Sequence, residues 1–111
     1  MKKLVAIIDY GVGNLFSVKQ AVEVSGEANA YVTNDPSIIA AADRVILPGV
    51  GAFSQGMRGL VESKLVDPIL SVAESGVPIF GICLGMQLVA SMSNEFSLTA
   101  GLGLIGGEVQ R

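Results

Sequence analysis

Four short hydrophobic runs recur along the chain, separated by segments long enough to form helices. The runs cover residues 4–8, 30–33, 44–47 and 77–82. Three of them are apolar at nearly every position instead of alternating with polar residues, which is typical of strands buried on both faces of a parallel sheet. We therefore predict four strands that need helical cover on both sides.

The segment after the first run predicts a helix between Asn14 and Gly26. Asn14 suits the N-cap position and Gly26 can close the helix. Leu15, Val18 and Val22 recur at helical spacing and form one apolar stripe, while the positions between them are mostly polar. The pattern predicts an amphipathic helix.

Two Asp-Pro pairs, at residues 35–36 and 67–68, each combine a capping residue with a first-turn proline. The first pair predicts a short helix through Ala42. The second predicts a helix that ends at Gly76 and that can continue a helix beginning near Ser54.

The last part of the chain predicts one more buried helix and a further strand. Residues 84–92 are apolar apart from Gln87 and Ser91, so we expect a buried helix there. The tail from Ala100 has the pattern of a turn that enters another strand, and it stops without a closing helix. We interpret this ending as premature.

The alternation of strands and helices predicts an α/β fold with a doubly wound, mostly parallel sheet flanked by helices. In such folds ligands bind outside the carboxyl ends of the strands. The loops to search for chemistry are therefore residues 9–14, 48–53 and 83–87.

The composition is apolar for a small domain. The chain has 111 residues, 50% of them hydrophobic and only 15% charged, with a mean hydropathy of +0.60. This length allows one domain at most. Because the surface of a soluble domain should be polar, either something covers part of this surface or part of the fold is missing. An isolated sheet with open edges and apolar faces would self-associate or dissolve poorly.

Charge and composition exclude several classes of function. The net charge is −3 and the basic residues are scattered apart from Lys2-Lys3, so we expect no nucleic-acid partner. No apolar stretch reaches the ~18 residues of a membrane span, and no secretory signal is evident, so we expect a cytoplasmic protein with no membrane association. One cysteine and no histidine allow no internal disulfide and no His/Cys metal site.

The single cysteine, Cys83, lies in the sequence Gly81-Ile82-Cys83-Leu84-Gly85. This is the glycine spacing of a nucleophile elbow, placed where a predicted strand passes into a helix. Glycines on both sides relieve crowding in such a turn, and the N-terminus of the following helix favours the thiolate over the thiol. The alternative is that Cys83 is a small, inert core residue.

Two further segments carry candidate site residues. Gln87 follows Cys83 by one helical turn, so its amide could bind a substrate beside the sulfur, although a satisfied buried amide would have the same pattern. Gly49, Val50 and Gly51 follow the third predicted strand, and their backbone N–H groups could face a developing negative oxygen. An ordinary turn at the end of a strand uses the same residues.

The loop at residues 9–14 has two glycines, but Phe16 replaces the third glycine of a dinucleotide-binding loop. We therefore expect no dinucleotide cofactor. A turn that presents Asp9 and Asn14 to another surface fits the sequence better.

Four segments together resemble a known family. DYGVGNLFSV, LPGVGAF, GICLGMQL and GLGLI, in this order and at these intervals, resemble the N-terminal half of the glutaminase subunit of imidazole glycerol phosphate synthase, a class I glutamine amidotransferase with a flavodoxin-like fold. The resemblance covers nearly all of the chain. It implies that residues 1–111 form the N-terminal part of a single glutamine amidotransferase domain.

The resemblance also implies a function and a set of site residues. The family hydrolyses glutamine and passes the ammonia to a (β/α)₈ cyclase subunit, with which it forms a heterodimer. By this likeness Cys83 is the nucleophile and the amides of Val50 and Leu84 form the oxyanion hole. Gly49 and Gly51 match the flexible strand beside the substrate. Gln87 matches a glutamine-binding residue, and Asn14 lies on the face that docks on the cyclase; no cofactor or metal is implied.

The chain departs from the family pattern in one respect. Members carry a catalytic histidine and glutamate in a second half, whereas this chain has no histidine at all. We therefore expect negligible glutaminase activity from the chain alone. Two alternatives stay open: a non-catalytic module that docks on the cyclase, or a small reactive-thiol protein in which Glu23 or Asp9 assists Cys83.

Overall fold

The computed structural model describes residues 3–11, 15–24, 26, 28–49, 51, 53–82, 84–93 and 99–109. Its strands are β1 (Lys3–Ile8), β2 (Ala28–Thr33), β3 (Arg44–Leu47), β4 (Ile79–Gly81), β5 (Ala90–Ser93), β6 (Thr99–Ala100) and β7 (Ile105–Val109). Its helices are α1 (Leu15–Val24), α2 (Pro36–Ala41), α3 (Phe53–Glu62), α4 (Val66–Glu74) and α5 (Leu84–Leu88).

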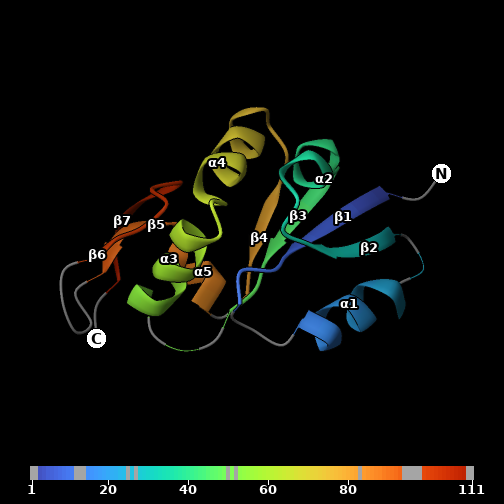
Figure 1. The fold of residues 1–111 in the computed structure, drawn as a ribbon, viewed down its shortest axis with the longest axis horizontal. Helices are drawn as coiled ribbons and strands as arrows, with labels where there is room; N and C mark the ends of the chain where they lie inside the picture. The colour runs from blue at the N-terminus through green and yellow to red at the C-terminus, as the bar shows by residue number, and fades with distance from the viewer. Residues whose placement is uncertain are drawn as a thin grey trace.

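The main sheet has four parallel strands in the order β2-β1-β3-β4. Chain order therefore reverses direction between β1 and β3, as in doubly wound folds. The predicted α/β class and the parallel sheet are confirmed. A second sheet, β6-β5-β7, lies at the far end of the molecule from β2 and joins one antiparallel and one parallel pair (Figure 1).

Helices cover the two faces of the main sheet unequally. Helix α1 lies on one face, and α2 and α4 lie on the other (Figure 1). Side chains of β1 and β3 alternate between the faces: Ala6 and Ile8 of β1, with Val45 and Leu47 of β3, belong to the buried core cluster. This cluster also takes in residues of α2, α3, α4 and α5.

The face beside α1 stays open at its β3–β4 end. Ile46 and Phe80 line a groove there of about 380 Å³, together with Val18 and Val22 of α1. The Phe80 side chain is 64% exposed. No residue of α1 is fully buried, which shows that the predicted apolar stripe of this helix covers only part of the sheet.

The helix signals at Asp35 and Gly26 are confirmed. The Asp35 carboxylate accepts the Ser37 backbone N–H at 2.9 Å and its hydroxyl at 2.8 Å, and Pro36 takes the first helical position. These bonds lower the pKa of Asp35 below its ordinary value. Gly26, with φ +74°, closes the turn after α1 by donating its N–H to the Glu23 carbonyl.

The possible continuous helix from Ser54 to Gly76 is instead two helices. Helix α3 ends in a Schellman motif, in which the Leu65 N–H donates to Leu60 O and the Lys64 N–H to Val61 O. Lys64 has the left-handed φ of +59° that glycine usually supplies. Because a lysine occupies this position, the sequence has no glycine there to indicate the end of α3.

The predicted cap at Asp67 is wrong, since Leu65 occupies the N-cap of α4 and Asp67 lies within its first turn. The C-terminal signal at Gly76 holds: its φ is +93°, and the Gly76 N–H donates to Ala73 O.

The predicted helix over residues 84–92 is wrong beyond Leu88. The Leu88 carbonyl accepts the N–H of Leu102, and Ala90 starts a strand that pairs with Ile105. Long-range pairing therefore replaces the helical hydrogen bonds that an apolar sequence alone would favour. The strand expected in the tail is confirmed as β7.

None of the helices in the described ranges is both long enough and apolar enough to cross a membrane.

Leu60 and its neighbour Val61 provide a matched test of this packing. Leu60 is fully buried in the core cluster, whereas Val61 is 60% exposed. Leu60→Ala should lower the free energy of unfolding by about 2–5 kcal/mol, because it removes buried methyl groups and leaves a cavity. Val61→Ala should change it by no more than about 0.5 kcal/mol. Urea unfolding followed by circular dichroism measures both, and equal effects would contradict the placement of α3.

Candidate active site

The carboxyl ends of three neighbouring strands meet at one edge of the main sheet. Because β1, β3 and β4 are parallel, the residues that follow them, Tyr10, Pro48 and Ile82, lie at the same edge. Leu47 is in register with Gly81, and the Ile82 N–H donates to the Leu47 carbonyl at 3.0 Å. The β3–β4 ladder thus continues to the residue just before Cys83.

Gly85 holds the start of α5 against the end of β3. The Gly85 N–H donates to Ile82 O at 2.9 Å, which closes a turn between strand and helix. A Cβ atom at Gly85 would lie 1.7 Å from the Leu47 carbonyl oxygen and 2.6 Å from its carbon, so only glycine fits. The crowding expected of an elbow is therefore present on this side of the turn. Cys83 itself lies outside the described residues.

The loop after β3 lies beside this turn. Pro48 and Gly49 are buried, and Gly51 has a φ of +99°. A Cβ atom at Gly51 would also lie 3.3 Å from Oε1 of Gln55 on α3. Val50, the predicted oxyanion-hole residue of this loop, lies outside the described residues.

Tyr10 joins the loops after β1 and β3, although no sequence pattern marks it as a site residue. Its side chain is 3% exposed and its hydroxyl donates a buried hydrogen bond to the Pro48 carbonyl. Helix α3 packs directly on it, since a Cβ atom at Gly59 would lie 2.7 Å from the Tyr10 carbonyl oxygen and 3.2 Å from its ring. Burial raises the pKa of Tyr10 to about 12. No local sequence signal identifies this contact, because its two partners are 38 residues apart.

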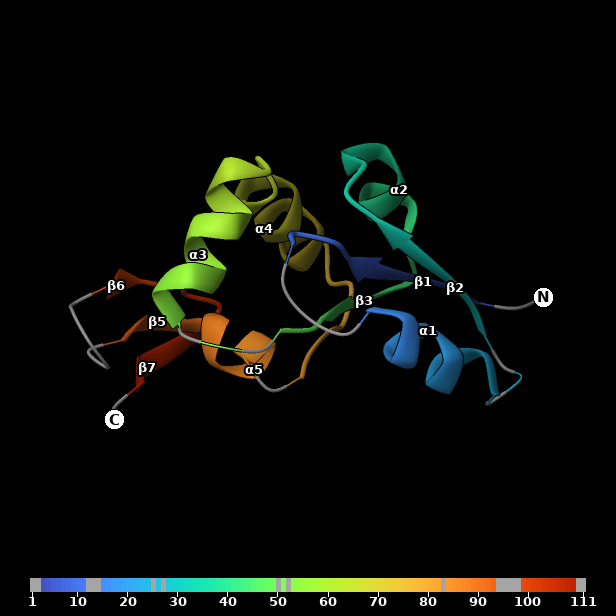
Figure 2. The same cartoon turned by 60° about the horizontal axis from the view of Figure 1, so that its bottom comes forward.

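The other predicted site residues fall at the same edge or outside the described ranges. Leu84 is the first residue of α5, and Gln87 lies three positions further on the same helix, where it is half-buried. Residues three apart on a helix lie on the same side. Helix α5 also packs against α3, as Figure 2 shows. Asn14 lies outside the described residues.

The two carboxylates considered as helpers of Cys83 are placed differently. Asp9 follows β1 at the carboxyl edge, where its Oδ1 accepts the Gly11 N–H at 3.3 Å. Glu23 is exposed in the last turn of α1. The end of this helix lies beside the start of β2 (Figure 1). Because α1 runs from the carboxyl end of β1 to the amino end of β2, Glu23 lies at the opposite edge of the sheet and is poorly placed to assist.

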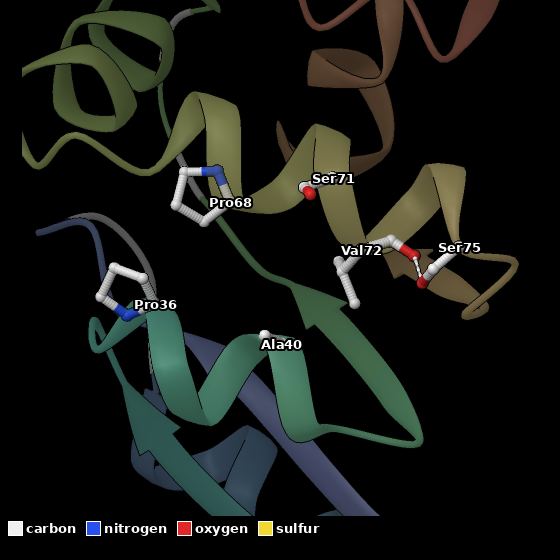
Figure 3. Close-up of a pocket in the computed structure, with 6 residues that line it drawn as sticks. All are labelled: Pro36, Ala40, Pro68, Ser71, Val72 and Ser75. Carbon is white, nitrogen blue, oxygen red and sulfur yellow. Dashed lines mark hydrogen bonds between the residues drawn. The ribbon is translucent and has the colours of Figure 1, made fainter.

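A separate cavity of about 340 Å³ lies between α2 and α4 (Figure 3). Pro36 and Pro68 stand at one end of it and Ser75 at the other, where the Ser75 hydroxyl donates to the Val72 carbonyl at 2.7 Å. The cavity is lined by small and apolar side chains with no titratable group: Pro36, Ala40, Pro68, Ser71, Val72 and Ser75. It offers no group for catalysis.

Comparison with known proteins agrees with this geometry. The family model described as glutamine amidotransferase class-I matches residues 6–101. The chain therefore belongs to the class-I glutamine amidotransferase family. A crystal structure of a glutamine amidotransferase superimposes with a TM-score of 0.76 at 22% identity, covering 96% of this chain and 56% of that one, which supports the same fold.

Among curated relatives, the chain is similar to subunits of one enzyme. It is 51% identical over 105 residues to imidazole glycerol phosphate synthase subunit HisH 1 of Legionella pneumophila (strain Lens), covering 95% of this chain and 49% of the relative. It is 54% identical over 107 residues to subunit HisH of Moorella thermoacetica, covering 96% of this chain and 50% of that protein. The chain thus spans about half the length of these relatives.

The contact between Gly85 and Leu47 can be tested by one added methyl group. Gly85→Ala should lower the free energy of unfolding by at least about 3 kcal/mol, because the backbone of α5 must move away from β3. Gly26→Ala is the control: no atom lies within 4 Å of its Cβ position, so only its left-handed φ opposes the change, at about 1 kcal/mol. Chemical denaturation measures both. Equal losses would contradict the close approach of α5 to β3.

Proposed function

We propose that this chain supplies the nucleophile half of a glutaminase that hydrolyses glutamine and delivers ammonia to a (β/α)₈ cyclase in histidine biosynthesis. The observation that carries the proposal is the contact of Gly85 with the Leu47 carbonyl. It brings the start of α5, which follows Cys83 directly in the sequence, against the end of β3, where the Gly49–Gly51 loop begins. Family membership and the similarity to HisH subunits support the same assignment.

In this proposal Cys83 is the attacking group. Its thiolate adds to the side-chain carbonyl carbon of glutamine, and the electron pair of the C=O bond moves to the oxygen. The backbone N–H groups of Val50 and Leu84 stabilise that oxyanion. When the oxyanion collapses, the C–N bond breaks, ammonia leaves with an added proton, and a glutamyl thioester remains for water to hydrolyse.

Positions on the described part of the chain fit these roles. Leu84 begins α5, so its N–H is one of the groups that an α-helix leaves unpaired within the helix. Gln87 on the same helix is assigned to hold the amino-acid part of glutamine. Gly49 and Gly51 let the backbone beside the substrate approach closely and change direction.

The proton transfers depend in this family on a histidine and a glutamate of the second half of the domain. The leaving nitrogen requires an acid and the thiol requires a base, and the sequence has no histidine. We assign both roles to residues of the half of the domain that the relatives have and that these 111 residues do not match. The loop at Asp9–Asn14 is assigned to the face that meets the cyclase.

A second candidate is a non-catalytic module that binds its partner without turning over glutamine. The open groove at Ile46 and Phe80 favours it, because an exposed apolar surface of this kind usually marks an interaction site. The missing proton donor is consistent with both candidates, so activity must decide between them.

The deciding measurement is ammonia release from glutamine. The chain alone should give turnover at least about 10³-fold below that of a complete amidotransferase, since it lacks the acid and the base. Adding the C-terminal half of the Legionella relative, together with the cyclase, should restore measurable turnover. Cys83→Ser should then abolish it, whereas Ser63→Ala, on the exposed turn after α3, should not change it.

Two outcomes would contradict the proposal. Full turnover by the chain alone would show that the base and acid lie within residues 1–111. A stable complex with the added half and the cyclase, but no turnover above the Cys83→Ser variant, would select the non-catalytic module.

A further inference from the structure

Tyr10 has a buried side chain whose hydroxyl connects two loops of the candidate active site. Its hydroxyl donates to the Pro48 carbonyl, and its ring and backbone pack against α3 at Gly59. Nothing in the chemistry of glutamine hydrolysis requires a phenol at this place. The role of the Tyr10 hydroxyl must therefore depend on the Pro48 carbonyl to which it is bonded.

The group it holds is the first peptide unit of the loop after β3. Leu47 is the last residue of β3, and its carbonyl is bonded within the sheet by the Ile82 N–H. The Pro48 carbonyl is the next acceptor, and it is bonded by Tyr10. Because a trans peptide is planar, fixing the Pro48 oxygen also fixes the direction of the Gly49 N–H on its other side.

We propose that Tyr10 is a positioning residue that orients the Pro48–Gly49 peptide and so keeps the following loop ready to stabilise an oxyanion. This inference rests on the proposed function, which assigns the oxyanion role to that loop. Glycine has more accessible backbone conformations than other residues, so an anchor just before Gly49 reduces the number available to Gly49 and Gly51.

The surroundings of Tyr10 make it a constant donor. Its pKa of about 12 keeps the hydroxyl protonated throughout the physiological range. The contact with Gly59 prevents the ring from moving towards α3, since the space there is already filled. The hydroxyl can therefore hold the Pro48 carbonyl at any pH at which the enzyme would work.

The chain offers a matched pair of variants, because it has two tyrosines and Tyr31 is 52% exposed on β2. Tyr10→Phe removes only the donor oxygen. It should accelerate hydrogen exchange at the Gly49 and Gly51 amides by about tenfold, since a buried carbonyl loses its partner. Tyr31→Phe should leave both exchange rates unchanged. Equal exchange in the wild type and Tyr10→Phe would overturn the proposal.

A second assay separates positioning from general stability. Iodoacetamide alkylates the Cys83 sulfur by displacing iodide, and no charge develops on a carbonyl oxygen. Glutaric semialdehyde instead forms a hemithioacetal: the S–C bond forms, the C=O π bond breaks, and the thiol proton ends on the oxygen. Tyr10→Phe should raise the aldehyde concentration that half-protects Cys83 about tenfold, with the alkylation rate in the absence of aldehyde changed less than about twofold.

The outcomes distinguish the two hypotheses. If the aldehyde does not protect the wild-type chain, the proposed function loses support, and the exchange rates at Gly49 and Gly51 decide the role of Tyr10 on their own. If Tyr10→Phe changes alkylation and protection equally, the residue is merely structural and the proposal fails.

If Tyr10→Phe does not fold, the Tyr31→Phe chain supplies an independent test. Its single remaining phenol is Tyr10, which should titrate near pH 12 by ultraviolet absorbance instead of at the ordinary value of 10. Because the folded pKa is raised, the stability that this group contributes is complete below pH 10 and is lost as the pH rises through about 12. Titration near pH 10 in the folded chain would overturn the proposal, since the hydroxyl would not be buried on Pro48.

Discussion

The carbonyl group of Leu47 is the point on which the rest of the candidate site depends. It accepts the Ile82 N–H that ends the β3–β4 ladder, and the backbone of Gly85 rests against the same oxygen. One main-chain group thereby sets the position of a strand end and of a helix start. The contact is between main-chain atoms, so no side-chain rearrangement could make room for a Cβ atom at position 85. Glycine is therefore required there. The placement of α5 beside the end of β3 follows from this packing as much as from local turn preference.

Contacts to main-chain carbonyl groups also position the loop after β3. Tyr10 bonds the Pro48 carbonyl, and Gly59 lets α3 approach the Tyr10 backbone closely enough to bury its ring. The ends of β1, β3 and β4 are therefore linked through carbonyl oxygens, with helices α3 and α5 packed behind them. In the proposed function, this arrangement would aim backbone N–H groups before charge develops on the substrate. It uses few charged residues, which agrees with a chain that is only 15% charged.

The unequal cover of the two sheet faces explains the high hydrophobic content. On the face with α2 and α4, the alternating residues of β1 and β3 are fully buried. On the other face α1 covers β1 and β2, while Phe80 stays exposed beside an apolar groove. The relatives that this chain matches are about twice as long. An exposed apolar surface beside an open groove usually marks an interaction site.

Local sequence determined the four strands of the main sheet, β7 and several helix ends. Hydrophobic runs mark β1 and β3 because burial on both faces demands apolar residues, and Asp35 marks a helix start because its carboxylate caps neighbouring N–H groups. Tertiary structure decided the rest. Lys64 adopts a glycine-like turn because Leu60 and Leu65 are buried on either side of it, and α5 stops at Leu88 because the distant Leu102 takes the carbonyl there. The hydrogen bond from Tyr10 to Pro48 is also a feature that only the tertiary structure decides. It joins residues far apart in the chain, so it follows only from how the strands and α3 pack.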